Sequence, residues 1–256
     1  MKINLRMLFG IGFLIMFTAI LILLFSSTNH NLIFVFSSVI FLAYSLVILN
    51  IFQQYKDEEE PKILRYPSLS VLIPAHNEEE TIVKTLNSIK KLKYPKPFEI
   101  IVLDDGSSDR TYSLANKIKG VKVIRFEKNK GKAKVLNYGI SIAKGELIAC
   151  IDADTFPKEN ALMKMIGYFN DKKVGAVTTL ITVDKPKTFL QKLQELEYYV
   201  AFGFWHKSLS VIDSLYVTPG PMSIYRKSAL KDIGGYDEKN MTEDLEIALN
   251  LKKHGY

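Results

Sequence analysis

The sequence contains a single cysteine, Cys150, among its 256 residues. The chain can therefore form no internal disulfide and no cysteine-ligated metal cluster, and Cys150, inside an apolar run, is interpreted as a small core residue. The sequence also lacks internal repeats, low-complexity tracts, and basic helices with interleaved aromatic residues. Nucleic acid is therefore not an expected partner, although the formal net charge is +7.

Charge is absent from two long apolar runs, residues 7–26 and 31–52. Each run is about 20 residues long, which as a helix spans a hydrocarbon core of about 30 Å. We therefore expect residues 1–52 to form a transmembrane hairpin, followed by a charged linker at residues 53–67. Two alternatives remain open: a signal peptide for the first run, or two buried helices of a soluble protein.

Lysine and arginine are missing from the short segment between the two runs, residues 27–30. They occur on both outer sides of the runs, as Lys2, Arg6, Lys56, Lys62 and Arg65. The positive-inside rule then predicts a multi-pass protein of the cell membrane, with its soluble domain in the cytoplasm. The positive charge of that domain suits membrane lipids or a phosphorylated small substrate.

Beyond the linker, short apolar runs alternate with helical patterns. Strands are expected at 69–75, 98–104, 121–126 and 146–152, with helices at 78–92, 109–119 and 132–144. A helix at 158–170, a β-rich run at 174–183, a long helical stretch at 188–213 and a last helix from Thr242 follow. Such alternation predicts an α/β fold with a mainly parallel sheet, whose ligand-binding loops follow the strands along one edge.

Polar side chains follow the first two expected strands. Asn77 and Glu78 come after the first strand, and Asp104, Asp105 and Gly106 come at the end of the second. These residues are also good helix caps and turn formers, so a purely structural role and a ligand-binding role both remain open.

Asp152 and Asp154 end the fourth apolar run. If the strand persists that far, its alternation points both carboxylates to the same face. Two close carboxylates repel each other unless a cation lies between them, and hard oxygen ligands favour Mg²⁺ or Mn²⁺. The alternative is an ordinary polar turn.

Two further charged groups lie at expected helix starts. Lys132 begins a helix, where a cation opposes the helix dipole, and this favours an anion such as diphosphate. A solvated lysine-rich loop is the alternative. Glu243 and Asp244 begin the last helix, either as first-turn acidic residues after a Thr242 cap or as a general base.

Together these motifs resemble those of family-2 inverting glycosyltransferases, in the membrane-bound branch of poly-N-acetylglucosamine, chitin, hyaluronan and cellulose synthases. The segments "PAHNEEE", "DDGSSD", "NKGKAKVLNYG", "DAD", "YRKSAL" and "TEDLEIALNLKKHGY" occur in the family's order. The resemblance implies a nucleotide-sugar-binding α/β fold of the GT-A type over residues 68–256.

The resemblance also implies a role for each matching residue. Those expected to bind the nucleotide sugar are Pro74, Ala75, Asn77, Glu78, Asp104, Asp105, Lys132 and Asp152, with Asp105 on the uracil and Lys132 near the diphosphate. Asp154 is the expected ligand of Mg²⁺ or Mn²⁺, and Asp244 is the expected base. Weaker acceptor-side candidates are Gly220, Glu243, Tyr198 and Trp205.

The implied reaction moves a sugar, most plausibly N-acetylglucosamine, from a UDP-sugar to a polysaccharide acceptor. One alternative is the transfer of a single sugar to a lipid-linked acceptor. The other is a non-catalytic subunit that binds a nucleotide sugar. Processive relatives carry a Q-x-x-R-W motif after the T-E-D segment, which the sequence to Tyr256 does not contain. We therefore expect a C-terminally truncated member of the family.

Overall fold

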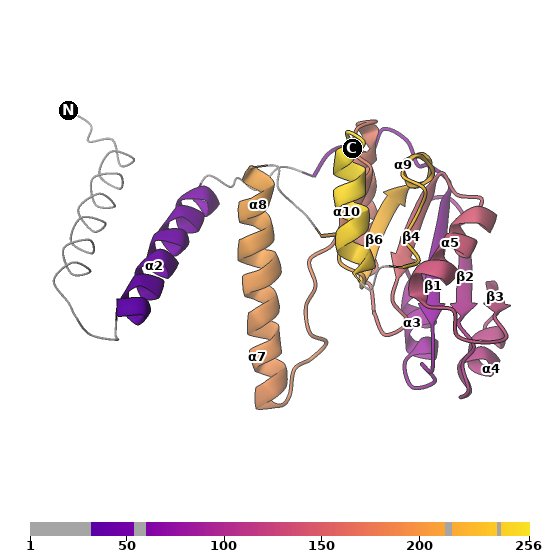
Figure 1. Ribbon diagram of the computed structural model, residues 1–256. Helices are drawn as coiled ribbons and strands as arrows, with labels where there is room; N and C mark the ends of the chain where they lie inside the picture. The colour runs from indigo at the N-terminus through magenta and orange to yellow at the C-terminus, as the bar shows by residue number, and fades with distance from the viewer. Residues whose placement is uncertain (1–31, 54–59, 213–216, 240–241) are drawn as a thin grey trace. The chain divides into compact units, whose positions relative to one another are not determined.

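The computed structural model describes residues 32–53, 60–212, 217–239 and 242–256 (Figure 1). The chain divides into two compact units. The first comprises residues 1–56 and 183–214, and the second comprises residues 57–182 and 215–256. Residues 183–214 fall inside the domain expected at 68–256, but they group with the N-terminal segment.

The described part of the first unit is mainly helical. Helix α2, Leu32–Phe52, is the one helix among the described residues that is long and apolar enough to cross a membrane. The expected run at 7–26 lies outside the described residues, so the hairpin stays a prediction. A continuous helical stretch also belongs to this unit. It consists of α7 (Phe189–Tyr198), the π-helix η2 (Tyr199–His206) and α8 (Lys207–Val211).

Aromatic contacts join α2 to η2 within this unit. The rings of Tyr44 and Trp205 stack with centroids 5.8 Å apart, and those of Phe52 and Phe204 lie 4.8 Å apart. At the start of α7, Thr188 and Gln191 form a complete capping box. This box satisfies backbone donors that a helix start leaves unpaired.

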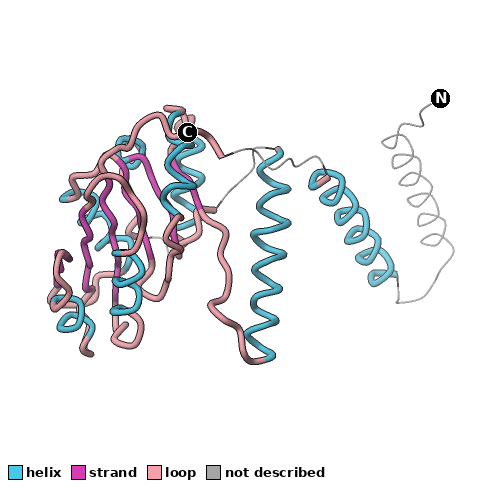
Figure 2. The backbone as a smooth tube through the Cα atoms, turned by 180° about the vertical axis from the view of Figure 1, so that it is seen from behind, coloured by secondary structure: helices cyan, strands magenta, loops and turns pink. Residues whose placement is uncertain are grey.

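The second unit is built on a six-stranded sheet in the order β3-β2-β1-β4-β6-β5 (Figures 1 and 2). The strands are β1 (Leu69–Ala75), β2 (Glu99–Asp104), β3 (Val121–Arg125), β4 (Leu147–Ile151), β5 (Ala176–Thr178) and β6 (Met222–Arg226). The first four pair in parallel, as expected, whereas β6 runs antiparallel to both β4 and β5. The sheet is therefore mixed, and the expected β-rich run at 174–183 contributes only three residues.

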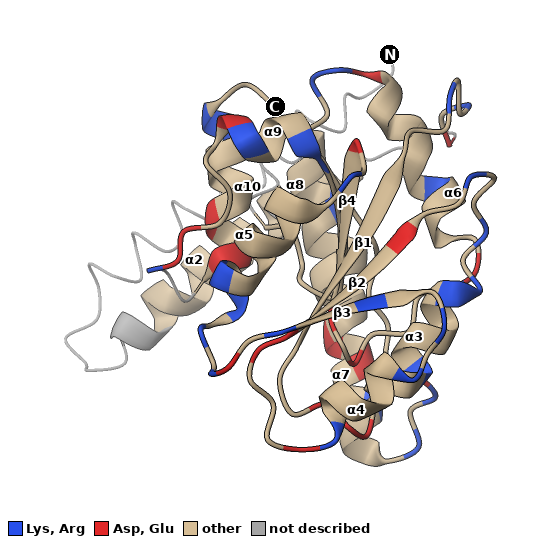
Figure 3. Ribbon diagram, turned by 90° about the vertical axis from the view of Figure 1, so that its right-hand side faces the viewer, with Lys and Arg blue, Asp and Glu red and all other residues tan. Residues whose placement is uncertain are grey.

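Helices cover both faces of this sheet. They are α3 (Ile82–Lys90), α4 (Thr111–Asn116), α5 (Lys132–Ile142), α6 (Ala161–Ile166), α9 (Lys227–Asp232) and α10 (Glu243–Lys253). One hydrophobic core lies against α3, α4 and α6, and the other lies against α5, α9 and α10. The strands are mostly uncharged, and the charged residues gather on helices and loops (Figure 3).

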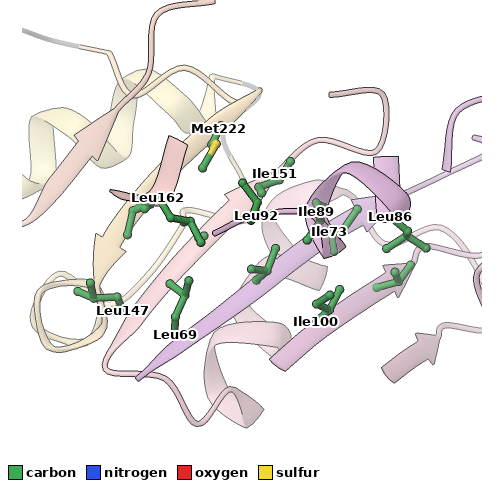
Figure 4. Close-up of a cluster of buried hydrophobic side chains, with 14 of the residues drawn as sticks. Leu69, Ile73, Leu86, Ile89, Leu92, Ile100, Leu147, Ile151, Leu162 and Met222 are labelled. Atoms are coloured by element: carbon green, nitrogen blue, oxygen red, sulfur yellow. The ribbon is translucent and has the colours of Figure 1, made fainter. Parts of the chain in front are cut away.

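Strand periodicity explains why two cores form. In β4, Leu147, Ala149 and Ile151 belong to the first core, while Ile148 and Cys150 belong to the second. Figure 4 shows part of the first core. Cys150 is the buried core residue that the sequence indicates, and burial raises the pKa of its thiol to about 12.

Replacing Ile148 by alanine should lower the free energy of unfolding by about 2–5 kcal/mol, because it leaves a cavity in a fully buried position. Val83→Ala on the exposed side of α3, where the valine is 37% exposed, should change it by about 0.5 kcal/mol or less. Urea unfolding of the full chain followed by circular dichroism measures both. Equal effects would contradict the assigned core.

Candidate active site

A cavity of about 310 Å³ opens where β1, β2 and β4 end. Parallel strands place their carboxyl ends along one edge, so the loops that follow them converge there. Seven residues expected from the sequence line this cavity: Pro74, Ala75, Glu78, Asp105, Lys132, Asp152 and Asp154. The structure therefore brings the separate motifs together at one cavity.

Asp152 and Asp154 reach the cavity from a turn rather than from a strand. Strand β4 ends at Ile151, and the Thr155 N–H donates to the Asp152 carbonyl at 3.1 Å. The expectation that the strand extends through Asp152 is therefore wrong. Asp152 is partly buried and Asp154 is exposed, yet both carboxylates line the cavity.

Lys132 is the cation of the site. It is the first residue of α5, and its Nζ lies 2.9 Å from Asp152 Oδ1 and 3.5 Å from Glu243 Oε1. Burial alone would lower the pKa of Lys132, but the carboxylates of Asp152, Asp244 and Glu243 outweigh it and hold the pKa above its usual value. The amine is therefore charged throughout the physiological pH range.

Asp244, in the first turn of α10, lies beside the same lysine. Burial raises the pKa of Asp244 to about 6, against the opposing effect of Lys132 and with further upward contributions from Glu243 and Asp152. A carboxylate with this pKa is largely ionised at neutral pH and takes up a proton more readily than an exposed one. Both properties suit a general base.

Gly220 is the backbone position around which these charges meet. A Cβ there would lie 2.8 Å from Asp244 Oδ2, 2.9 Å from Lys132 Nζ and 3.0 Å from Asp152 Oδ2. The three charged atoms thus surround one point that only a glycine leaves open. Gly220, expected on the acceptor side, is in the centre of the charge cluster.

Asp104 and Asp105 are adjacent but have different surroundings. Asp105 lines the cavity, and its two carboxylate oxygens accept the backbone N–H groups of Lys130 and Gly131 at 2.7 and 2.9 Å. Asp104 is fully buried, with Oδ1 accepting from Ser107 N–H and Oδ2 3.3 Å from Arg125 Nε. Asp104 therefore supports the loop, and its expected contact with the nucleotide stays a prediction.

The first loop is held by side-chain contacts to the second. Asn77 adopts a positive φ of 56°, and its Oδ1 accepts from the Ser108 N–H at 2.9 Å. The Glu78 N–H donates to Thr111 Oγ1 at 2.7 Å. Asn77 therefore positions the loop, while Glu78 lines the cavity. Tyr198 and Trp205 belong to the other unit, and their acceptor role stays a prediction.

Five lining residues had no expected role: His76, Asn129, Gly131, Val135 and Ala153. His76 Nδ1 lies 2.8 Å from the Asp105 carbonyl oxygen, which joins the first two loops. Gly131 precedes α5 with a φ of +92°, and the "NKGK" segment is the signal that could have identified it. Ala153 is buried, and nothing in its residue type indicates a site.

Comparison with known proteins identifies the family. The family model described as glycosyl transferase family 2 matches residues 70–234, which is more than half of the chain. The chain is a family-2 glycosyltransferase. This assignment agrees with the motif order in the sequence and with the GT-A arrangement of the sheet.

This glycosyltransferase is similar in sequence to part of several curated proteins. The poly-beta-1,6-N-acetyl-D-glucosamine synthase of Staphylococcus epidermidis is 36% identical over 192 residues, which cover 73% of this chain and 46% of the relative. A Staphylococcus aureus synthase of the same name gives the same figures. The chain therefore spans about half the length of these relatives.

Solved structures share its fold. A mannosyltransferase from Pyrobaculum calidifontis, in complex with GDP-Man and Mn²⁺, has a TM-score of 0.69 at 23% identity, covering 84% of this chain and 60% of that one. S. aureus TarS 1-349, in complex with UDP-GlcNAc, has a TM-score of 0.53 at 25% identity, covering 72% and 53%.

The carboxylate ligands of the glycosyltransferase fit a divalent cation that is bound partly by the protein and partly by a substrate. Among the residues that the structure describes, no group of three or more His, Cys, Asp or Glu side chains could hold a metal. Asp152 and Asp154 line one cavity, however, and Mg²⁺ typically takes one or two carboxylates and completes its shell with phosphates and water. The two aspartates therefore suit a metal that arrives with a diphosphate.

Gly220→Ala should reduce glycosyl transfer at least about tenfold, because the new methyl group would displace Asp244, Lys132 or Asp152. Gly203→Ala is the matched control, since a Cβ there meets no atom within 4 Å outside its chain neighbours and its own helix backbone. UDP release by the purified full chain measures the effect, with thermal unfolding as a check on folding. Wild-type turnover by Gly220→Ala would contradict this geometry.

Proposed function

We propose that this glycosyltransferase transfers N-acetylglucosamine from UDP-N-acetylglucosamine to a polysaccharide acceptor, with inversion at the anomeric carbon. The observation that carries the proposal is the meeting of Asp244, Lys132 and Asp152 around Gly220, next to the cavity at the strand ends. The identity to poly-N-acetylglucosamine synthases and the likeness to a UDP-GlcNAc complex support this choice of sugar.

The donor would lie along the cavity. Pro74, Ala75 and Glu78 would border the nucleoside, with Asn77 holding their loop in place and Asp105 facing the uracil. Lys132 would pair with the diphosphate from the first turn of α5, where the backbone N–H groups of the helix also favour an anion.

The metal would be held by Asp154, with Asp152 beside it on the nucleotide side. When bound, Mg²⁺ or Mn²⁺ supplies Lewis acidity that stabilises the negative charge on departing UDP. Lys132 adds a fixed positive charge to the same region, because its neighbouring carboxylates keep it protonated.

Asp244 would act as the general base. A hydroxyl oxygen of the acceptor bonds to the anomeric carbon as the bond from that carbon to the UDP oxygen breaks, and the hydroxyl proton passes to Asp244. Because the oxygen attacks from the face opposite the nucleotide, the sugar is inverted. A well-placed carboxylate base contributes on the order of 10²–10⁴-fold to such a step.

The enzyme would work at the cytoplasmic side of the cell membrane. Helix α2 would anchor it in the lipid, and the run at residues 7–26 would make it multi-pass. A polysaccharide at this surface is the proposed acceptor, and a lipid-linked sugar is the alternative. Product length separates the two, since a lipid-linked acceptor of this kind would gain a single sugar.

Asp154→Asn should abolish most metal-dependent turnover, because the amide is a weaker ligand than the carboxylate it replaces. UDP release by the purified full chain, with UDP-GlcNAc or UDP-glucose and with Mn²⁺ or Mg²⁺, tests metal and donor together. Asp171→Asn, at an exposed aspartate of the same unit, is the control. Unchanged UDP release by Asp154→Asn would rule out the metal assignment, and faster release from UDP-glucose would rule out the proposed sugar.

The pH dependence of kcat/KM should follow the ionisation of Asp244. Because a base must be ionised, kcat/KM should rise with pH up to about 6 and level off above it. Lys132 opposes the increase in the pKa of Asp244, so Lys132→Met should move this limb to higher pH as well as lowering the rate. Lys134→Met, at an exposed lysine paired with Glu238, should leave the limb in place. An unchanged limb in Lys132→Met would exclude Asp244 as the titrating base.

A further inference from the structure

The turn that carries Asp152 and Asp154 needs support from outside the sheet. Strand β4 ends at Ile151, so the alternation of a strand does not direct the two carboxylates. Between them, Ala153 is only 4% exposed and belongs to the first hydrophobic core. With Ala153 directed inward, both aspartates are left on the cavity side.

A buried hydroxyl holds the middle of this turn. Thr85 Oγ1 donates a hydrogen bond of 2.6 Å to the Ala153 carbonyl oxygen, across 68 positions of the chain. Thr85 is fully buried. A helical threonine commonly donates to the carbonyl one turn back, whereas this hydroxyl satisfies a carbonyl of the turn.

Helix α3 is a rigid base for this contact. Its residues Ile82, Leu86 and Ile89 are fully buried in the same core as Ala153. Thr85 lies on the same buried face of the helix. A side chain fixed on a packed helix can restrain a backbone position more tightly than one on a loop.

Helix α3 and the residues directly after it also contact the segment that follows the turn, at Phe156 and Glu159. Lys84 Nζ lies 3.6 Å from the ring centroid of Phe156. The Lys93 N–H donates to the Glu159 carbonyl at 2.7 Å, and the two side chains form an ion pair of 3.3 Å. These contacts involve the exposed residues Lys84, Lys93 and Glu159, whereas the contact of Thr85 with the turn is buried.

We infer that Thr85 is a positioning residue for the metal ligand Asp154. Its hydroxyl fixes the Ala153 carbonyl and thereby the direction in which the next side chain leaves the backbone. The inference rests on the proposed function, because it takes Asp154 as the metal ligand. Supporting groups around a metal site typically contribute 10–100-fold to metal affinity or activity.

Electron paramagnetic resonance of Mn²⁺ with the full chain and saturating UDP tests the inference without requiring turnover. Thr85→Val keeps the shape of the side chain and removes the hydroxyl, and it should raise the Mn²⁺ dissociation constant about tenfold or more. Thr85→Ser keeps the donor and should bind Mn²⁺ as the wild type does. Irreversibly misfolded protein would lower the amplitude of binding without changing the dissociation constant, whereas reversible unfolding would raise the apparent dissociation constant. A thermal melt that shows Thr85→Val folded at the assay temperature excludes the second effect.

Ser70→Ala is the matched control for the loss of a buried hydroxyl. Ser70 is fully buried near the opposite end of β1, where its Oγ accepts from the Gly145 N–H at 2.7 Å. This variant should lower the melting temperature and leave Mn²⁺ affinity unchanged. A wild-type dissociation constant in Thr85→Val, or an equal increase in Thr85→Ser or Ser70→Ala, would overturn the role of Thr85.

Asp154→Asn separates this inference from the proposed function. If Asp154→Asn weakens Mn²⁺ binding and Thr85→Val does not, the metal ligand is correct and the positioning role is wrong. If Asp154→Asn binds Mn²⁺ as the wild type does, the metal assignment itself is wrong.

Discussion

The site depends on one lysine that holds several carboxylates together. Asp152, Glu243 and Asp244 come from two distant parts of the chain, and like charges at such distances repel each other strongly where water is partly excluded. Lys132 lies 2.9 Å from Asp152 and 3.5 Å from Glu243, and it offsets that repulsion. The approach also requires Gly220, because any side chain there would occupy the meeting point.

The sheet explains how such distant residues meet. Strands β1 and β4 are parallel neighbours, so the turn after β4 lies beside the loop after β1. Strand β6 runs antiparallel to β4, and the segment preceding it brings Gly220 next to Asp152. The first residue of α5 then reaches the same edge. An antiparallel strand inside a parallel sheet is thus what closes the site.

Much of the fold could be predicted because it depends on local patterns. Strand β1 has the expected bounds, and β2, β3 and β4 differ by one residue at an end or at both. Successive apolar residues of β4 point to opposite faces of the sheet and so contribute to both cores, and this alternation can be predicted from the sequence. The helix expected at 158–170 becomes α6 followed by a 3₁₀ turn, Gly167–Asn170, because helix ends depend on packing.

The sequence by itself determined the fold class, the family and the seven expected residues that line the cavity, since these depend on motif order and strand ends. Only the tertiary structure decided that Asp105 lines the cavity and Asp104 does not, although both are buried. It also decided that burial raises the pKa of Asp244 to about 6 and that Thr85 holds the Ala153 carbonyl. Each of these depends on distances between segments far apart in the chain, and a carboxylate's environment cannot be read from its neighbours in sequence.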